Sequence, residues 1–214
     1  MSVRIKQFAA IAVLLAVPAL VLAAAAPDKA EKVAEKMLGL DKAIQQGAAQ
    51  IDKTLASLNA LAQPEGDLTA KYKDFSKNVD TLDKMSQKAK SNAEAAAKDR
   101  DAYIAQWKAS QDKIQNPELK TASEARRAEL QPKIEAIKTS LGAARETFTP
   151  FMQDLKDLRT FLANQLNPGG IAAAQSLITK CNESGEKVKS DLSQGSTAVK
   201  DLAQSIAPGG AAKK

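Results

Sequence analysis

The sequence predicts an all-α protein, an antiparallel up-down four-helix bundle with coiled-coil packing and a longer central helical hairpin. Gly and Pro cluster at only a few points, and the segments between them are rich in good helix formers such as Ala, Lys, Glu, Gln and Leu. Apolar residues also recur at alternating steps of three and four in four long segments. Four such segments joined by short turns bury their stripes against one another, which is the arrangement of a helical bundle.

The breaks in the pattern divide the chain into helices over residues 28–62, 67–115, 117–167 and 171–206. Asp28 and Asp67 are the predicted caps of the first two helices, and Asn116 with Pro117 opens the third. The connecting turns are "QPEG", "NPEL" and "NPGG". Residues 26–207 are therefore expected to form a single helical bundle domain, followed by a flexible tail over residues 208–214.

Each helix carries an apolar stripe that we expect to form the core. In the first helix it consists of Val33, Met37, Leu40, Ile44, Ile51, Leu55 and Leu58. In the second it consists of Leu68, Tyr72, Phe75, Val79, Leu82, Ser86, Ala89, Ala93, Ala96, Arg100, Tyr103, Trp107, Ser110 and Ile114. In the third it consists of Leu130, Ile134, Ile137, Leu141, Ala144, Phe148, Phe151, Leu155, Leu158 and Leu162. In the fourth it consists of Ala174, Ile178, Cys181, Gly185, Val188, Leu192, Gly195, Val199, Leu202 and Ile206.

The lengths of the helices predict a projecting arm. The two central helices have about 49 residues each and the outer two about 35, so the outer helices should stop short of the "QNPEL" turn. The distal part of the hairpin, residues 103–130, would then project as a two-stranded arm. Trp and Tyr often dominate binding at interfaces, and the predicted partner contacts in this arm are Tyr103, Trp107, Lys108, Arg126 and Arg127. The alternative is that Tyr103 and Trp107 only pack the two strands of the arm together.

The N-terminus has the features of a secretory signal peptide over residues 1–25. Arg4 and Lys6 precede an apolar run that ends in a stretch of Ala residues and turns abruptly polar. The expected location is periplasmic or secreted. The apolar run is also near the length that spans a bilayer, so anchoring through an uncleaved signal remains the alternative.

Several kinds of chemistry find no support in the composition. The chain has no His, which excludes imidazole-based haem, zinc and general-base sites. Its one Cys, Cys181, lies on the fourth stripe and is expected to be buried and inert. Acidic residues fall mostly beside Lys and Arg, a pattern typical of surface pairs on helices. We therefore expect no enzymatic activity, no cofactor and no metal.

A resemblance to a known family adds to this interpretation. The segments "GDLTAKYKDF", "TPFMQDLKDLRTFLANQLN" and "IAAAQSL", with the Trp107 segment, resemble a bacterial envelope family described as a domain of unknown function, DUF2959, over residues 53–180. The likeness implies a helical fold and an envelope location, and for many members of the family a lipoprotein anchor. The present chain has no lipid-accepting Cys after its apolar run, and the family implies no activity.

The expected function is that of a non-enzymatic cell-envelope protein acting as a helical spacer or protein-binding module. The alternative is a bundle that binds lipid or a membrane surface by opening, because small residues such as Gly185 and Gly195 on the fourth stripe would leave a thin core. The expected partner is an unknown envelope protein or an anionic surface, with lipid as a further candidate. Nucleic acid is not expected, and a homo-oligomer is left open.

Overall fold

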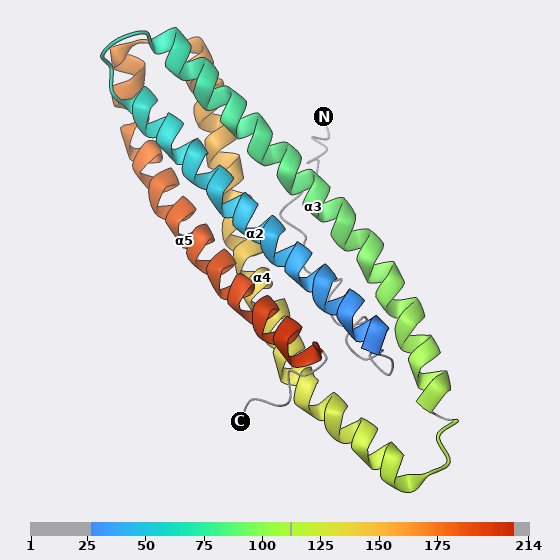
Figure 1. Ribbon diagram of the computed structural model, residues 1–214. Coiled ribbons are helices and arrows are strands. Elements are labelled where there is room, and N and C mark those ends of the chain that lie inside the picture. The colour runs from blue at the N-terminus through green and yellow to red at the C-terminus, as the bar shows by residue number, and fades with distance from the viewer. Residues whose placement is uncertain (1–26, 112, 208–214) are drawn as a thin grey trace, which may run out of the picture. The chain divides into compact units, whose positions relative to one another are not determined.

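The structure is a computed structural model that describes residues 27–111 and 113–207, and within them it contains four α-helices and no strand. The helices are α2 (Pro27–Ala62), α3 (Leu68–Gln111), α4 (Pro117–Asn164) and α5 (Pro168–Ile206), as Figure 1 shows. The predicted all-α, four-helix architecture is confirmed. The expected signal peptide over residues 1–25 and the tail over residues 208–214 lie outside the described residues.

Two of the predicted helix caps are present. The Oδ1 atom of Asp67 accepts hydrogen bonds from the backbone N–H groups two and three residues further on, at 2.9 and 3.1 Å. The Oδ1 atom of Asn116 does the same at the start of α4, also at 2.9 and 3.1 Å. These carboxylate and amide oxygens satisfy backbone donors that have no partner inside the helix. The turn before Asp67 closes with Gly66 at a φ of 81°, a conformation that glycine adopts without steric cost.

Four helix boundaries differ from those expected. α3 ends at Gln111 instead of residue 115, α4 ends at Asn164 instead of residue 167, and α5 begins at Pro168 instead of residue 171. The Oδ1 atom of Asn167 accepts the N–H of Gly170 at 3.0 Å, so Asn167 caps α5. A capping residue has non-helical dihedral angles, and α4 must therefore end before it. α2 begins at Pro27, so Asp28 lies within the first turn of the helix.

The chain divides into two compact units, and every helix contributes to both. The described part of the first unit comprises residues 46–90 and 144–190. The described part of the second unit comprises residues 27–45, 91–111, 113–143 and 191–207.

The first unit contains segments of all four helices and the two turns that join α2 to α3 and α4 to α5 (Figure 1). Its most deeply buried large side chains are Ile51, Leu58, Leu61, Phe75, Phe148, Phe151, Leu155, Leu158 and Leu162. The rings of Phe148 and Phe151 meet edge to face, with centroids 6.2 Å apart, a favoured geometry for aromatic pairs. Along one contact line, Asp52 pairs with Lys189 and Asn59 bonds Asn182, so residue numbers rise along α2 as they fall along α5.

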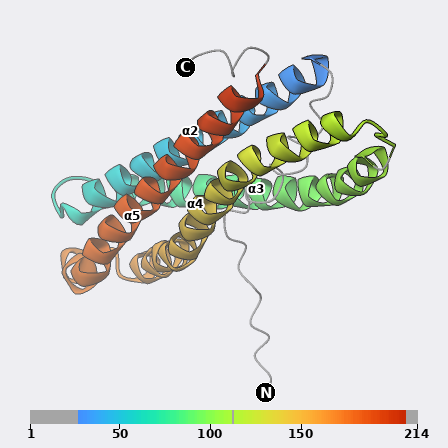
Figure 2. The ribbon, with the colours of Figure 1, turned by 90° about the horizontal axis from the view of Figure 1, so that it is seen from below.

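The second unit brings the first half of α2 beside the end of α5, as Figure 2 shows. Its buried apolar side chains come from α2, α4 and α5 and include Val33, Met37, Ile44, Leu130, Ile134, Ile137, Leu141, Leu192, Val199, Leu202 and Ile206. Side chains of α3 in this unit between residues 93 and 108 lie outside the described set.

Burial confirms most of the predicted core stripes. Every stripe position of α4 and α5 is buried, including Phe148 and Phe151, so the aromatic stripe of α4 is core and not a surface groove. In α3 the stripe is buried from Phe75 to Ser86, and its later positions are only partly described. In α2 one assignment is wrong: Leu40 is only half buried, and Asp41 is buried at 7 % exposure in its place.

The small residues of α5 do not leave a thin core. A Cβ atom built on Gly185 would lie 2.8 Å from Leu55 Cδ1 and 3.2 Å from Phe151 Cε2, within the first unit. A Cβ atom on Gly195 would lie 2.5 Å from Leu141 Cδ2, within the second unit. Large side chains from the neighbouring helices therefore occupy the space that the glycines leave. The close approach expected at these glycines is therefore filled by facing side chains, which the pattern of a single helix does not show.

Candidate functional site

The first turns of α4 form an exposed end of the second unit. Residues 115–122 are all exposed, and α4 continues past the end of α5 in this region (Figure 1). Leu119 is 62 % exposed, the highest value among the exposed large hydrophobic side chains of the described residues. A helical end that is solvated on all sides and carries an exposed leucine is a candidate contact surface.

Leu119 lies on the same face of α4 as the core. It precedes Leu130 by eleven residues, which is about three helical turns, and Ser123 and Arg126 lie between them at steps of four and three. Leu130 is 3 % exposed, whereas Leu119 is 62 % exposed. The core face of α4 therefore continues beyond the last buried layer. Sequence reasoning missed Leu119 because the apolar spacing lapses between it and Leu130, although the phase itself was a usable signal.

Two of the five predicted contact residues can be placed. The Arg126 side chain is half buried, donates to the backbone carbonyl of Ser205 at the end of α5, and pairs with Glu129 at 2.5 Å. α5 thus reaches residue 126, inside the segment that was expected to project. Arg127 is exposed and takes part in an interaction of its own. The side chains of Tyr103, Trp107 and Lys108 lie outside the described set.

The charge of this end is nearly balanced. Residues 103–130 carry five basic and four acidic side chains, which gives a net charge of +1. Ion pairs that are largely open to solvent, such as that of the half-buried Arg126 with the exposed Glu129, contribute little to stability, but they neutralise part of the local charge. A surface of this kind is suited to a protein partner that contacts Leu119 better than to attraction by a strongly anionic surface.

A buried polar cluster joins α2 to α5 within the second unit. Asp41 accepts a hydrogen bond from the Ser196 hydroxyl, accepts another from the Gln45 side-chain amide at 2.8 Å, and lies 3.6 Å from the Lys200 ammonium. Asp41 and Ser196 are 7 % and 8 % exposed. A carboxylate held by a hydroxyl, an amide and a cation is satisfied, since each partner donates to it. Within the cluster, the group that could act as a base toward Ser196 is the Asp41 carboxylate, which is already paired. We therefore assign the cluster a structural role, which is to fix the register of α2 and α5.

Cys181 lies fully buried on α5 in the first unit, as predicted. Burial raises the pKa of its thiol to about 12, and the nearby Asp154 carboxylate adds to the effect. The neighbouring Lys180 has a raised pKa because its ammonium is hydrogen-bonded to Asp154, at 2.8 Å in the ion pair. Since the thiolate is the nucleophile, Cys181 is unreactive near neutral pH.

This pKa predicts how Cys181 affects stability at high pH. Well below pH 9.0, the ordinary pKa of the thiol, it is protonated in the folded and unfolded states alike. Between pH 9.0 and about 12 the unfolded thiol ionises first, so unfolding releases a proton and the free energy of unfolding falls as pH rises. We expect Cys181→Ala to show a shallower alkaline decline in denaturant titrations. Equal slopes for the parent and the variant between pH 8 and pH 10.5 would contradict a buried thiol.

The described residues assemble no group of three His, Cys, Asp or Glu side chains that could hold a metal ion. Among the four described helices, none combines the length and the apolar character needed to cross a membrane. The apolar segment before residue 26 lies outside the described residues.

The fold and this site define a four-helix protein with a close-packed core and an exposed helical end. The family described as a protein of unknown function, DUF2959, matches residues 26–207, and the chain belongs to that family. The suspected resemblance is confirmed, and it extends beyond residues 53–180 to all four helices. No curated protein and no solved structure matches the chain.

Proposed function

We propose that this protein is a non-enzymatic helical protein of the cell envelope, where it acts as a protein-binding module through the α3–α4 end. The observation that carries the proposal is the exposure of Leu119 on the core face of α4, three turns beyond the last buried layer. Fully burying an exposed leucine side chain contributes about 1.5–3 kcal/mol. Leu119 makes only part of this contribution while it stays exposed. A partner that covers Leu119 would recover the rest. The envelope location rests on the signal-like N-terminus, which would place residues 26–207 in the periplasm or outside the cell.

The alternative, a bundle that opens to lay its apolar stripes on lipid, receives less support. Opening would have to withdraw Leu55 and Phe151 from Gly185 and Leu141 from Gly195. Each of these side chains is buried at 5 % exposure or less, so separating the helices exposes large apolar surfaces together. Binding through an end that is already exposed needs no such rearrangement.

A crosslinking experiment tests the proposed surface. A photoreactive residue placed at the exposed Ala122, in the full chain expressed in its own host, should give a discrete crosslinked protein species. Leu119→Lys should reduce that species strongly, because it replaces the apolar anchor with a charge. The matched control is Leu38→Lys on α2, where a leucine is similarly exposed, at 54 %. Equal crosslinking in both variants, or crosslinking to lipid alone, would refute the assignment.

Shortening the hairpin tests whether this end is separate from the core. Removing residues 105–111 from α3 and 118–124 from α4 deletes one heptad from each helix and keeps the phase of both stripes. The contact of Arg126 with Ser205 is retained. We expect the free energy of unfolding to change by less than about 1 kcal/mol, because Ala109 and residues 118–122, among the described residues of the deleted segments, are exposed. A much larger loss in a denaturant titration would place this segment in the core.

A further inference from the structure

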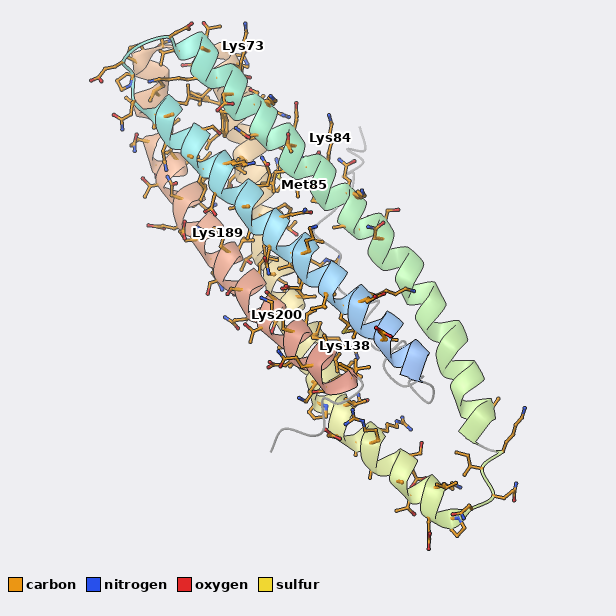
Figure 3. The ribbon with its side chains drawn as sticks, viewed as in Figure 1. Lys73, Lys84, Met85, Lys138, Lys189 and Lys200 are labelled. Atoms are coloured by element: carbon orange, nitrogen blue, oxygen red, sulfur yellow. The ribbon has the colours of Figure 1, made fainter. Side chains whose placement is uncertain are left out.

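We propose that the outer face of α3 in the first unit is an electrostatic docking surface for an anionic lipid bilayer, formed by Lys73, Lys77, Lys84 and Lys88. All four side chains are exposed. Figure 3 shows Lys73 and Lys84 pointing outward from α3. This surface, which we name the lysine stripe, is independent of the proposed protein-binding end.

The four lysines lie on one side of the helix. At about 100° per residue they fall within an arc of about 60°, and they extend over about 22 Å of helix length. The buried residues Phe75, Val79 and Leu82 lie about 180° away around the same helix. The stripe is therefore straight and opposite to the core, so all four ammonium groups can approach a flat surface together.

The fold separates charges that alternate in the sequence. Asp83 pairs with Lys156 of α4 at 2.7 Å, and Asp80 pairs with Arg159 of α4. Both acidic groups are thus matched by α4. Asp74 is the one remaining acidic residue of the α3 segment 68–90, and it is exposed beside the stripe.

The lysines of the stripe keep their charge for an external partner. No ion pair joins any of the four to another residue in the described part of the chain. By contrast, Lys71 donates to the carbonyls of Gln63 and Glu65 in the turn after α2.

The net charges of the first unit show the same asymmetry. Residues 68–90 carry six lysines and three aspartates, a net charge of +3. The other described segments of the unit, residues 46–67 and 144–190, carry seven basic and eight acidic side chains, a net charge of −1. Positive charge is therefore concentrated on the α3 segment, and the stripe contributes most of it.

A lipid surface fits the stripe better than a protein does. Protein interfaces are depleted in lysine and usually contain an aromatic or apolar anchor. The large exposed hydrophobic residues of the described chain are Leu38, Leu119 and Phe161, and none lies on α3. Lysines in a regular row attract anionic headgroups additively, by roughly a factor of five in affinity for each residue.

The test measures binding of the purified protein, in the form in which its host leaves it, to vesicles of equal parts phosphatidylglycerol and phosphatidylcholine. Vesicles of phosphatidylcholine alone give the contribution of any N-terminal apolar segment. The variant Lys73→Gln, Lys77→Gln, Lys84→Gln, Lys88→Gln removes the stripe. The control variant Lys36→Gln, Lys42→Gln, Lys53→Gln, Lys133→Gln has the same net charge and alters other surfaces. Gln has a helix propensity close to that of Lys, and circular dichroism checks that both variants fold.

We expect the stripe variant to lose several hundredfold in affinity for the anionic vesicles, and the control variant to lose less than roughly tenfold. Replacing the four lysines by Arg should preserve binding. Raising the salt concentration from about 0.05 M to about 0.5 M should weaken the parent but hardly affect the stripe variant. Equal losses in the two Gln variants would show that only net charge matters and would overturn the proposal. Unchanged affinity in the stripe variant, or equally strong binding of the parent to polyglutamate, would overturn it as well.

Discussion

Phe151→Ala should lower the free energy of unfolding by about 3–5 kcal/mol, which is typical of removing a fully buried aromatic ring. Phe151 is 0 % exposed and lies in the core of the first unit. It makes an edge-to-face contact with Phe148, and its Cε2 atom lies against the space left open by Gly185. The truncated side chain would leave a cavity between α4 and α5 and remove the ring contact as well. Denaturant titration followed by circular dichroism measures the change.

The matched control is Phe161→Ala, the same substitution ten residues further along α4. Phe161 is 36 % exposed, so the protein should lose about 1 kcal/mol or less. A large difference between the two variants is expected only if the α4 stripe is core. If Phe151→Ala were as mild as Phe161→Ala, the side chain would lie in an open groove, and the stripe would again be a candidate ligand site.

The stripes of α4 and α5 could be predicted because each keeps one apolar face without interruption over its length. Leu155, Leu158 and Leu162 follow the steps of three and four, and all three are buried. The caps Asp67 and Asn116 were also predictable, since the interactions that they make are local in the sequence. Local patterns of this kind carry enough information to place helices and their buried faces.

The buried Asp41 could not be predicted in the same way. Residues 40 and 41 both fit between Met37 and Ile44 at steps of three and four, and hydrophobicity favours Leu40. The structure buries Asp41 because the Ser196 hydroxyl, 155 residues away, donates a hydrogen bond to it. A buried carboxylate is tolerated when such donors are present. The sequence alone does not show which donor a distant helix will supply.

The two candidate surfaces also depend partly on local sequence and partly on residues far away in the chain. Helix lengths predicted an exposed end at the α3–α4 turn, but they did not show that α5 reaches Arg126 or that Leu119 stays exposed. The lysine stripe was hidden because its residues alternate with acidic ones along the chain. It becomes a distinct surface only when Asp80 and Asp83 pair with α4 residues 79 and 73 positions away.

Gly195→Leu should strongly destabilise the second unit, lowering the free energy of unfolding by about 3 kcal/mol or more. A Cβ atom on Gly195 would already lie 2.5 Å from Leu141 Cδ2, and a leucine would place three further carbon atoms in the same space. Both residues are buried, so the excess volume must separate α5 from α4 or force side chains out of their rotamers. Gly195→Ala should cost less, because the atom that it meets is the end of a flexible side chain.

Gly142→Ala, on the adjoining helix α4, should change the free energy of unfolding in the opposite direction. Apart from its chain neighbours and the backbone of its own helix, no atom of the described residues lies within 4 Å of the position that its Cβ would occupy. Replacing a glycine inside a helix by alanine stabilises by about 0.5–1 kcal/mol. We therefore expect Gly142→Ala to raise the midpoint of denaturation and Gly195→Leu to lower it, although both replace a helical glycine. If Gly195→Leu were as stable as the parent, Leu141 would not fill the space at Gly195. The core of this unit would then be loose enough to open, and binding of lipid by an opened bundle would regain its physical basis.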